Sequence, residues 1–127
     1  MRYLGVDYGT KRIGIALSDE MGMMAFPKVV LENNERFWAF FEDMVNKWKV
    51  EAVVLGESRN FKGGENPVHA ESMRFKEKIE KKLKLSVYLE PEYFTSAEAE
   101  RIQGKIANLD ASAAALILKS YLDRHHG

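Results

Sequence analysis

The order of apolar and polar residues along the chain predicts three strands before any helix. Residues 2–7 form a short apolar run, and residues 13–18 alternate apolar side chains after a turn at residues 8–12. Two such runs joined by a short turn are typical of a β-hairpin. A third strand is predicted over residues 24–31, where Pro27 marks an edge or a bulge because proline has no N–H to donate.

The rest of the chain alternates helices with strands. Apolar residues at helical spacing predict a first helix that is capped by Asn33 or Asn34 and runs to about Lys49. Its aromatic residues are assigned to the core rather than to base stacking: Phe37, Phe40, Phe41 and Trp48. The later elements are strands at residues 52–55 and 86–89, and helices at residues 67–83, from Thr95 onward and at residues 110–124. A three-strand meander followed by strand–helix alternation predicts an α/β fold, in which helices flank a central five-stranded mixed sheet.

The composition narrows the class of protein. The 127 residues suit one domain, residues 1–127, and 46% of them are hydrophobic and 30% charged, as in soluble globular proteins. The longest apolar run, Ala113–Leu118, has six residues, whereas a membrane-spanning helix needs about 20. The lack of cysteine excludes disulfides and thiolate metal sites. We therefore expect a cytoplasmic protein with no membrane partner.

Charge is balanced overall but segregated along the chain. The 19 basic and 19 acidic residues cancel, yet residues 74–84 hold six basic residues against Glu77 and Glu80. This run falls on the predicted second helix. It is either an ordinary solvated face, with Glu77–Lys81 and Glu80–Lys84 pairs, or a surface that tracks phosphates. The residues assigned to nucleic-acid binding are Arg74, Lys78 and Lys81 on this helix and Lys11, Arg12 and Lys62 on loops.

Three carboxylates lie at the ends of predicted elements, where a central-sheet fold can bring them together. Asp7 ends the first strand, Glu92 follows the last strand, and Asp110 opens the last helix. Each alone has a simpler interpretation: a turn aspartate, a solvated loop glutamate, and a helix N-terminal aspartate bound to backbone amides. Together, in a chain without cysteine, they suit Mg²⁺ or Mn²⁺. Two such ions about 4 Å apart can clamp the attacking and leaving oxygens of a phosphodiester.

The two aspartates are also predicted to share faces with apolar neighbours. Because strand side chains alternate, Asp7 points to the same side of the sheet as Tyr3 and Gly5. The last helix is apolar and should be buried. The helix face that begins with Asp110 continues with Ala114, Ile117 and Tyr121.

Residues 4–19, LGVDYGTKRIGIALSD, resemble the first motif of the YqgF-type (RuvX-type) nucleases, a family of ribonuclease H-like proteins named as Holliday junction resolvases or pre-16S rRNA nucleases. The similarity continues at residues 53–56 (VVLG), 63–65 (GGE), 95–99 (TSAEA) and 110–118 (DASAAALIL). It implies a ribonuclease H-like fold and a metal-dependent endonuclease. It also implies that Asp7 bridges two ions, that Glu92 and Asp110 each hold one, and that a metal-activated water attacks phosphorus.

The chain departs from the family pattern around Glu92. The family has an acid before this glutamate and an arginine after it, where this chain has Pro91 and Tyr93. A missing arginine affects how a phosphate is bound, and Arg59 is a candidate to replace it. Glu57 and Thr95 are accessory candidates near the metals.

Two other functions fit parts of the sequence. The first is a non-catalytic, structure-specific nucleic-acid-binding protein, which would use the basic residues but leave the three carboxylates without a role. The second is an actin-like nucleotide-binding module, because residues 7–10 also resemble the phosphate-binding turn of actin-like ATPases. Those proteins close two such domains over the nucleotide, and this chain has the length of one. A structured RNA precursor and a branched DNA both remain candidate substrates, and the protein is a monomer or a homodimer.

Overall fold

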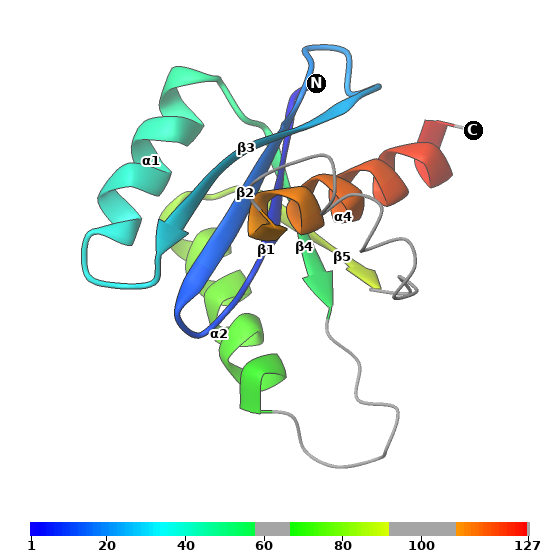
Figure 1. Cartoon of the computed structure of the whole chain (residues 1–127). Coiled ribbons are helices and arrows are strands. Elements are labelled where there is room, and N and C mark those ends of the chain that lie inside the picture. Colours follow the sequence, from blue (N-terminus) through cyan, green and yellow to red (C-terminus); the bar gives the residue numbers. More distant parts are fainter. Residues whose placement is uncertain (58–66, 92–108, 127) are drawn as a thin grey trace.

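The computed structural model describes residues 1–57, 67–91 and 109–126, with side chains from Ala70 onward in the second helix and from Ala113 to His125 in the last. Strands and helices follow one another as the sequence predicts (Figure 1). The strands are β1 (Tyr3–Asp7), β2 (Arg12–Ser18), β3 (Ala25–Glu32), β4 (Ala52–Glu57) and β5 (Ser86–Pro91). The helices are α1 (Phe37–Lys47), α2 (Pro67–Lys82) and α4 (Leu109–His126). The predicted helix from Thr95 onward lies outside the described residues.

The five strands form one mixed sheet in the order β3-β2-β1-β4-β5. The β1–β2 and β2–β3 pairs are antiparallel, and the β1–β4 and β4–β5 pairs are parallel. The predicted sheet is therefore confirmed. The three parallel neighbours β1, β4 and β5 all finish at one end, which we call the carboxyl end of the sheet. Their last residues there are Asp7, Glu57 and Pro91.

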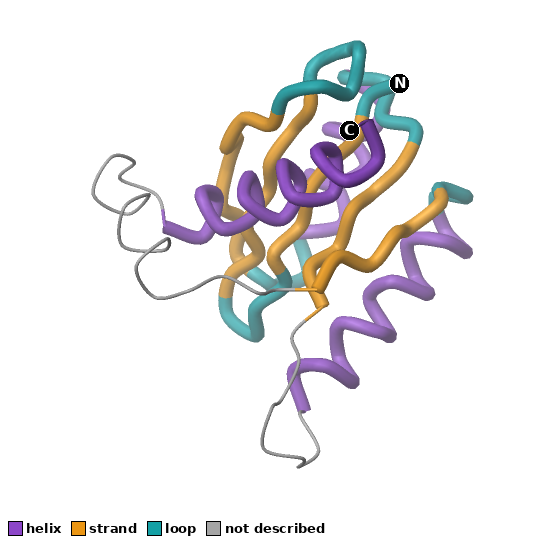
Figure 2. Tube along the Cα trace, turned by 90° about the vertical axis from the view of Figure 1, so that its right-hand side faces the viewer, coloured by secondary structure: helices purple, strands orange, loops and turns teal. Residues whose placement is uncertain are grey.

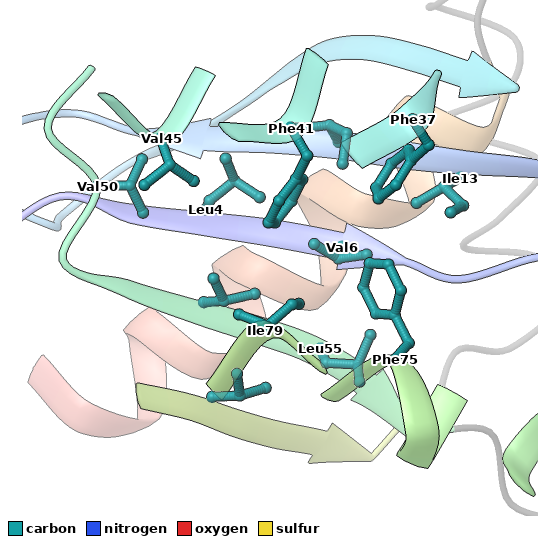
Figure 3. Packing of buried hydrophobic residues seen from close by; sticks show 13 residues of the cluster. Leu4, Val6, Ile13, Phe37, Phe41, Val45, Val50, Leu55, Phe75 and Ile79 are labelled. Carbon is teal, nitrogen blue, oxygen red and sulfur yellow. The ribbon is translucent and has the colours of Figure 1, made fainter. Parts of the chain in front are cut away.

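Helices cover both faces of the sheet, with α1 and α2 on one face and α4 across the other (Figures 1 and 2). Alternation along β1 divides its side chains between the two layers. Leu4 and Val6 join the cluster formed with α1 and α2 (Figure 3). Gly5 faces α4, and a Cβ on it would lie 2.8 Å from Leu118 Cβ and 2.9 Å from the Ala114 carbonyl oxygen. Helix α4 thus rests directly on the backbone of β1.

Strand β3 confirms both predictions made from its proline. It is the last strand of the sheet on its side. Its register with β2 steps from Val29 opposite Ile15 to Pro27 opposite Ala16, which leaves Lys28 as a bulge. At the other side of the sheet, β5 runs two residues further than predicted. Pro91 pairs there with Glu57 of β4, so tertiary pairing extends the strand beyond its local pattern.

Helix α1 begins at Phe37 after the cap residue Arg36, two or three residues later than a cap at Asn34 or Asn33 predicts. The Asn34 side chain accepts a hydrogen bond from the Arg36 N–H at 2.9 Å, and its carbonyl accepts one from the Phe37 N–H at 3.1 Å. Asn34 therefore closes a turn that precedes the helix. The assignment of Phe40 to the core is wrong, because its side chain is 53% exposed. The buried stripe of α1 follows Phe37, Phe41 and Val45, which excludes the position one residue before Phe41.

Among the described residues, no helix combines the length and the apolar character that crossing a membrane requires.

Replacing Gly5 by alanine should destabilise the fold, because the new methyl group would meet Leu118 and the α4 backbone. Overpacking of this kind costs about 1–3 kcal/mol of unfolding free energy. Urea denaturation followed by circular dichroism measures it. Asn46→Ala, on the exposed side of α1, is the control and should change stability by no more than about 0.5 kcal/mol. Equal stability of Gly5→Ala and the control would contradict the close packing of α4 on β1.

Candidate active site at the carboxyl end of the sheet

Asp7 is the last residue of β1 and is half-buried. It follows Gly5 by two residues, so its side chain is on the α4 face of the sheet, as predicted. The parallel register continues from Val6 opposite Leu55 to Gly56 beside Asp7, and Gly56 in turn pairs with Glu90 of β5. The residue next to Asp7 on β4 is therefore a glycine, which places no side chain beside the carboxylate on that strand.

The backbone of α4 begins near this end of β1. Asp110 is the second residue of the helix, and Ala114, one helical turn later, has its carbonyl against Gly5. Gly5 of β1 and Ala114 of α4 thus form the contact point. Asp7 is two strand residues from it and Asp110 is four helical residues from it, which is about 6–7 Å along each element. The helix face predicted for Asp110 is confirmed in its later positions, because Ala114, Ile117 and Tyr121 are all buried.

The third predicted carboxylate follows the end of β5. Glu92 comes directly after Pro91 and lies outside the described residues, as do Arg59, Lys62 and Thr95. The structure does place its chain neighbour Pro91 beside Glu57, the half-buried last residue of β4. The parts of the chain that the structure describes hold no group of three metal-binding side chains. Asp7 and Glu57, both with carboxylate oxygens, are the described members of the predicted set, and oxygen donors are what Mg²⁺ and Mn²⁺ prefer.

The turn after Asp7 presents two of the predicted phosphate-binding residues. Both are exposed; Lys11 lies between β1 and β2, and Arg12 is the first residue of β2. The turn is tight at Gly9, where a Cβ would lie 2.5 Å from the Arg12 carbonyl oxygen, so the position excludes a side chain. This tight turn places Lys11 and Arg12 four and five residues after Asp7 in the chain.

The basic residues of α2 lie further away. The first half of α2 approaches the carboxyl end of the sheet, where Glu71 and Phe75 contact Tyr8. The helix then runs to Lys82, and the chain turns back into β5. At 1.5 Å per residue, Lys81 is about 20 Å along the axis from the start of α2. Arg74, Lys78 and Lys81 are all exposed, but the last two lie toward the opposite end of the sheet.

Several charges of this helix already have partners. Lys78 lies over the Trp38 ring, with its Nζ 4.5 Å from the ring centroid. Glu80 pairs with Lys76 at 3.1 Å. The predicted Glu80–Lys84 pair is wrong, because α2 ends at Lys82 and Lys84 follows it with a φ of 56°. The basic side of α2 is therefore partly an ordinary solvated helix face with ion pairs, which is the alternative to a phosphate-binding surface.

A buried carboxylate that the sequence did not single out lies in the same row as Asp7. Glu90 is 1% exposed. It accepts a hydrogen bond from the Ser120 hydroxyl at 2.7 Å and forms an ion pair with Arg124. Both partners are on α4, so Glu90 ties the second half of this helix to β5. An isolated glutamate before a proline carries no sequence signal for such a contact.

An aromatic cluster lies beside this ion pair. The Tyr121 ring packs between Tyr3 of β1 and Tyr88 of β5, with centroid distances of 5.7 and 5.5 Å. Burial, together with the neighbouring tyrosines and Glu90, raises the pKa of the Tyr121 hydroxyl above its usual value. Tyr121 is therefore neutral at physiological pH, and its role here is packing.

Comparison with known proteins gives one family over nearly the whole chain. The family model described as "RuvX: Holliday junction resolvase" matches residues 1–124. A relative from Nitratidesulfovibrio vulgaris, named "Putative pre-16S rRNA nuclease", is 36% identical over 133 residues, which cover 97% of this chain and 94% of the relative. A relative of the same name from Lactobacillus acidophilus is 32% identical over 139 residues, with 98% of each chain covered.

Solved structures with the same fold are more distant in sequence. Thermus thermophilus RuvC in complex with a Holliday junction substrate superposes with a TM-score of 0.69 at 17% identity, covering 100% of this chain and 96% of that one. The fowlpox virus resolvase in complex with Holliday junction DNA has a TM-score of 0.64 at 13% identity, with both chains covered fully. These similarities confirm the ribonuclease H-like fold.

Removing Arg124 should destabilise the protein, because Glu90 would keep a buried charge with the Ser120 hydroxyl as its remaining partner among the described residues. Loss of one partner of a fully buried pair costs about 3–5 kcal/mol. Since Arg124 is itself 55% exposed, water can reach its place, and we expect about 1–3 kcal/mol. Arg124→Ala is compared by urea denaturation with Lys119→Ala, which breaks the exposed Lys119–Asp123 pair. The double variant with Glu90→Gln should recover part of the loss. No difference between the two single variants would contradict this role of Glu90.

Proposed function

The chain belongs to the RuvX family, and we propose that it is a divalent-metal-dependent endonuclease that hydrolyses phosphodiester bonds in structured nucleic acid. The observation that supports this proposal is the position of three element ends relative to the carboxyl end of the sheet. Asp7 ends β1 there, β5 ends one residue before Glu92, and α4 carries Asp110 in its first turn. Nothing in the fold itself requires acids at these three element ends.

In this proposal Asp7, Glu92 and Asp110 would hold the divalent metal ions through their carboxylate oxygens. Glu57, at the end of the intervening strand, is an accessory carboxylate, and Thr95 is an accessory hydroxyl after Glu92. When bound, two Mg²⁺ or Mn²⁺ ions lower the pKa of a bound water and neutralise charge on the phosphate during in-line attack. The protein supplies fixed carboxylates on strand and helix ends, and no covalent enzyme intermediate is needed.

Basic residues then bind the phosphates that flank the cleaved bond. Lys11 and Arg12 follow Asp7 by four and five residues, and Arg59 and Lys62 belong to the segment that follows Glu57. Arg74, Lys78 and Lys81 would contact only a substrate long enough to extend along α2. This spread fits a structured nucleic acid, which is read through its backbone and shape.

We favour a precursor of 16S rRNA as the substrate, in a cytoplasmic protein that acts as one domain over residues 1–127. The relatives above 30% identity carry that substrate in their name, whereas the proteins solved with Holliday junctions share 17% identity or less. Trimming an RNA needs one active site, so a monomer suffices. Symmetric cutting of a four-way junction would need two sites and hence a homodimer.

A cleavage assay tests the nuclease. Wild type and Asp7→Asn are incubated with Mg²⁺ or Mn²⁺ and two labelled substrates, a precursor 16S rRNA fragment and a four-way DNA junction. Asparagine keeps the size of Asp7 but removes the charge that holds the metal, so the rate should fall at least about 100-fold. Asp43→Asn makes the same change at an exposed position of α1 and should retain full activity. EDTA should abolish cleavage by wild type.

The outcomes separate the candidate functions. Cleavage of the RNA alone supports the favoured substrate, and cleavage of the junction alone replaces it with branched DNA. Metal-independent binding without cleavage would favour a non-catalytic binding protein. An ATP-dependent rise in melting temperature without nucleic-acid binding would favour the actin-like module.

The distances along α2 predict a length dependence. Lys11→Ala should weaken binding to short and long substrates alike, since Lys11 lies near Asp7. Lys81 follows Glu71, which contacts Tyr8, by ten helical residues, so Lys81→Ala should weaken binding only to substrates that extend about 15 Å or more beyond the cleavage site. Each lost phosphate contact should reduce the slope of log affinity against log salt by about 1. Fluorescence anisotropy on a length series measures this. A Lys81→Ala effect as large on the shortest substrate as on the longest would refute the placement.

A further inference from the structure

The hydroxyl of Tyr8 joins three segments of the chain immediately after Asp7. It accepts a hydrogen bond from Asn33 Nδ2 at 3.2 Å and donates one to Glu71 Oε2 at 3.4 Å. Tyr8 belongs to the β1–β2 turn, Asn33 to the connection from β3 to α1, and Glu71 to α2. Tyr8, the residue after Asp7, is thus hydrogen-bonded to α2, which lies on the face of the sheet opposite to α4.

The Tyr8 ring and the Tyr8 hydroxyl have separate tasks. The ring packs on Phe75 of α2 with a centroid distance of 5.1 Å and joins the edge of the larger hydrophobic cluster. This contact places the residue and does not need the oxygen. The hydroxyl adds only the polar contacts to Asn33 and Glu71. Removing the Tyr8 oxygen alone therefore separates the effect of its hydrogen bonds from the effect of its ring packing.

Asn33 holds the turn at three points. Its side-chain amide donates to the Tyr8 hydroxyl and also to the Gly9 carbonyl at 3.0 Å. Its backbone N–H donates to the Lys11 carbonyl at 2.9 Å. The turn that presents Lys11 and Arg12 is thus fastened along its length by a single residue outside it. The sequence predicts Asn33 only as a helix cap.

We propose that Tyr8, Asn33 and Glu71 are positioning residues that hold the turn at residues 9–12, so that Lys11 and Arg12 bind a substrate phosphate at a set distance from Asp7. The inference rests on the proposed nuclease function. If the turn were loose, its backbone would lose conformational freedom when Lys11 and Arg12 bind a phosphate, which weakens binding. A turn fixed beforehand avoids that loss. Because the Tyr8–Glu71 contact is long for an O–H···O bond, we expect Asn33 to contribute more than Glu71.

The test is a set of single substitutions in the full chain. Tyr8→Phe removes the oxygen and keeps the ring. Tyr88→Phe is its control, a tyrosine on β5 that is 39% exposed and stacks on Tyr121. Asn33→Ala and Glu71→Gln complete the set. For each variant, cleavage of the substrate that wild type prefers gives kcat and KM, and hydrogen–deuterium exchange gives the protection of the amides of residues 9–12.

Tyr8→Phe should raise KM about threefold to tenfold, the effect of one hydrogen bond, and leave kcat within about twofold. Asn33→Ala should raise KM further, and Glu71→Gln less. The amides of residues 9–12 should exchange faster in Tyr8→Phe and Asn33→Ala, with the melting temperature close to that of wild type. Tyr88→Phe should match wild type in all of these measurements.

Two results would overturn the inference. One is an unchanged KM in Tyr8→Phe and Asn33→Ala, which would show that the fixed turn does not serve binding. The other is a lower melting temperature with unchanged exchange of residues 9–12, which would make the contacts merely structural. A wild-type protein that cleaves neither substrate refutes the proposed function itself. In that case unchanged exchange in Tyr8→Phe would separately refute the positioning of the turn.

Discussion

The contact of α4 with the bare backbone of β1 at Gly5 is the constraint on which the rest of the arrangement depends. A methyl group at Gly5 would lie within 3 Å of both Leu118 and the Ala114 carbonyl oxygen, so the helix can approach this closely only because the residue is glycine. That approach brings the first turn of α4, with Asp110, to the level where β1 ends in Asp7. At its other end the same helix is held by the buried Glu90 of β5, through Ser120 and Arg124.

At the end of β1, Asp7 and Tyr8 point to opposite faces of the sheet. Asp7 faces α4, whose first turn carries Asp110. Tyr8 faces α1 and α2, where its ring and hydroxyl fasten the following turn. Alternation along a single strand thus places the Asp7 carboxylate on one face of the sheet and the Tyr8 side chain on the other. Parallel pairing of β1 with β4 and of β4 with β5 makes the three strand ends neighbours.

The sequence predicted what depends on local pattern. The hairpin, the edge strand with Pro27 and the burial of Ala114, Ile117 and Tyr121 are all confirmed, because periodicity and turn residues determine them. Contacts between distant side chains could not be read in the same way. The Glu90–Arg124 pair spans 34 positions and the Tyr8–Glu71 contact 63, and neither has a spacing or composition that marks it. The basic run was visible, but its distance from Asp7 follows from the direction of α2, which only the packing decides. Glu92, Arg59, Lys62 and Thr95 stay predictions from the sequence.

The central claim is that the carboxyl end of the sheet gathers Asp7, Glu92 and Asp110 around divalent metal. A crystal of the protein soaked in Mn²⁺ tests it directly, because manganese gives an anomalous difference peak that locates the ion without reference to activity. The account predicts a peak at the end of β1 within bonding distance, about 2.2 Å, of carboxylate oxygens from these three residues. The same soak of Asp7→Asn crystals should show no peak there. Manganese bound elsewhere only, or bound at this place equally well in Asp7→Asn, would contradict the account.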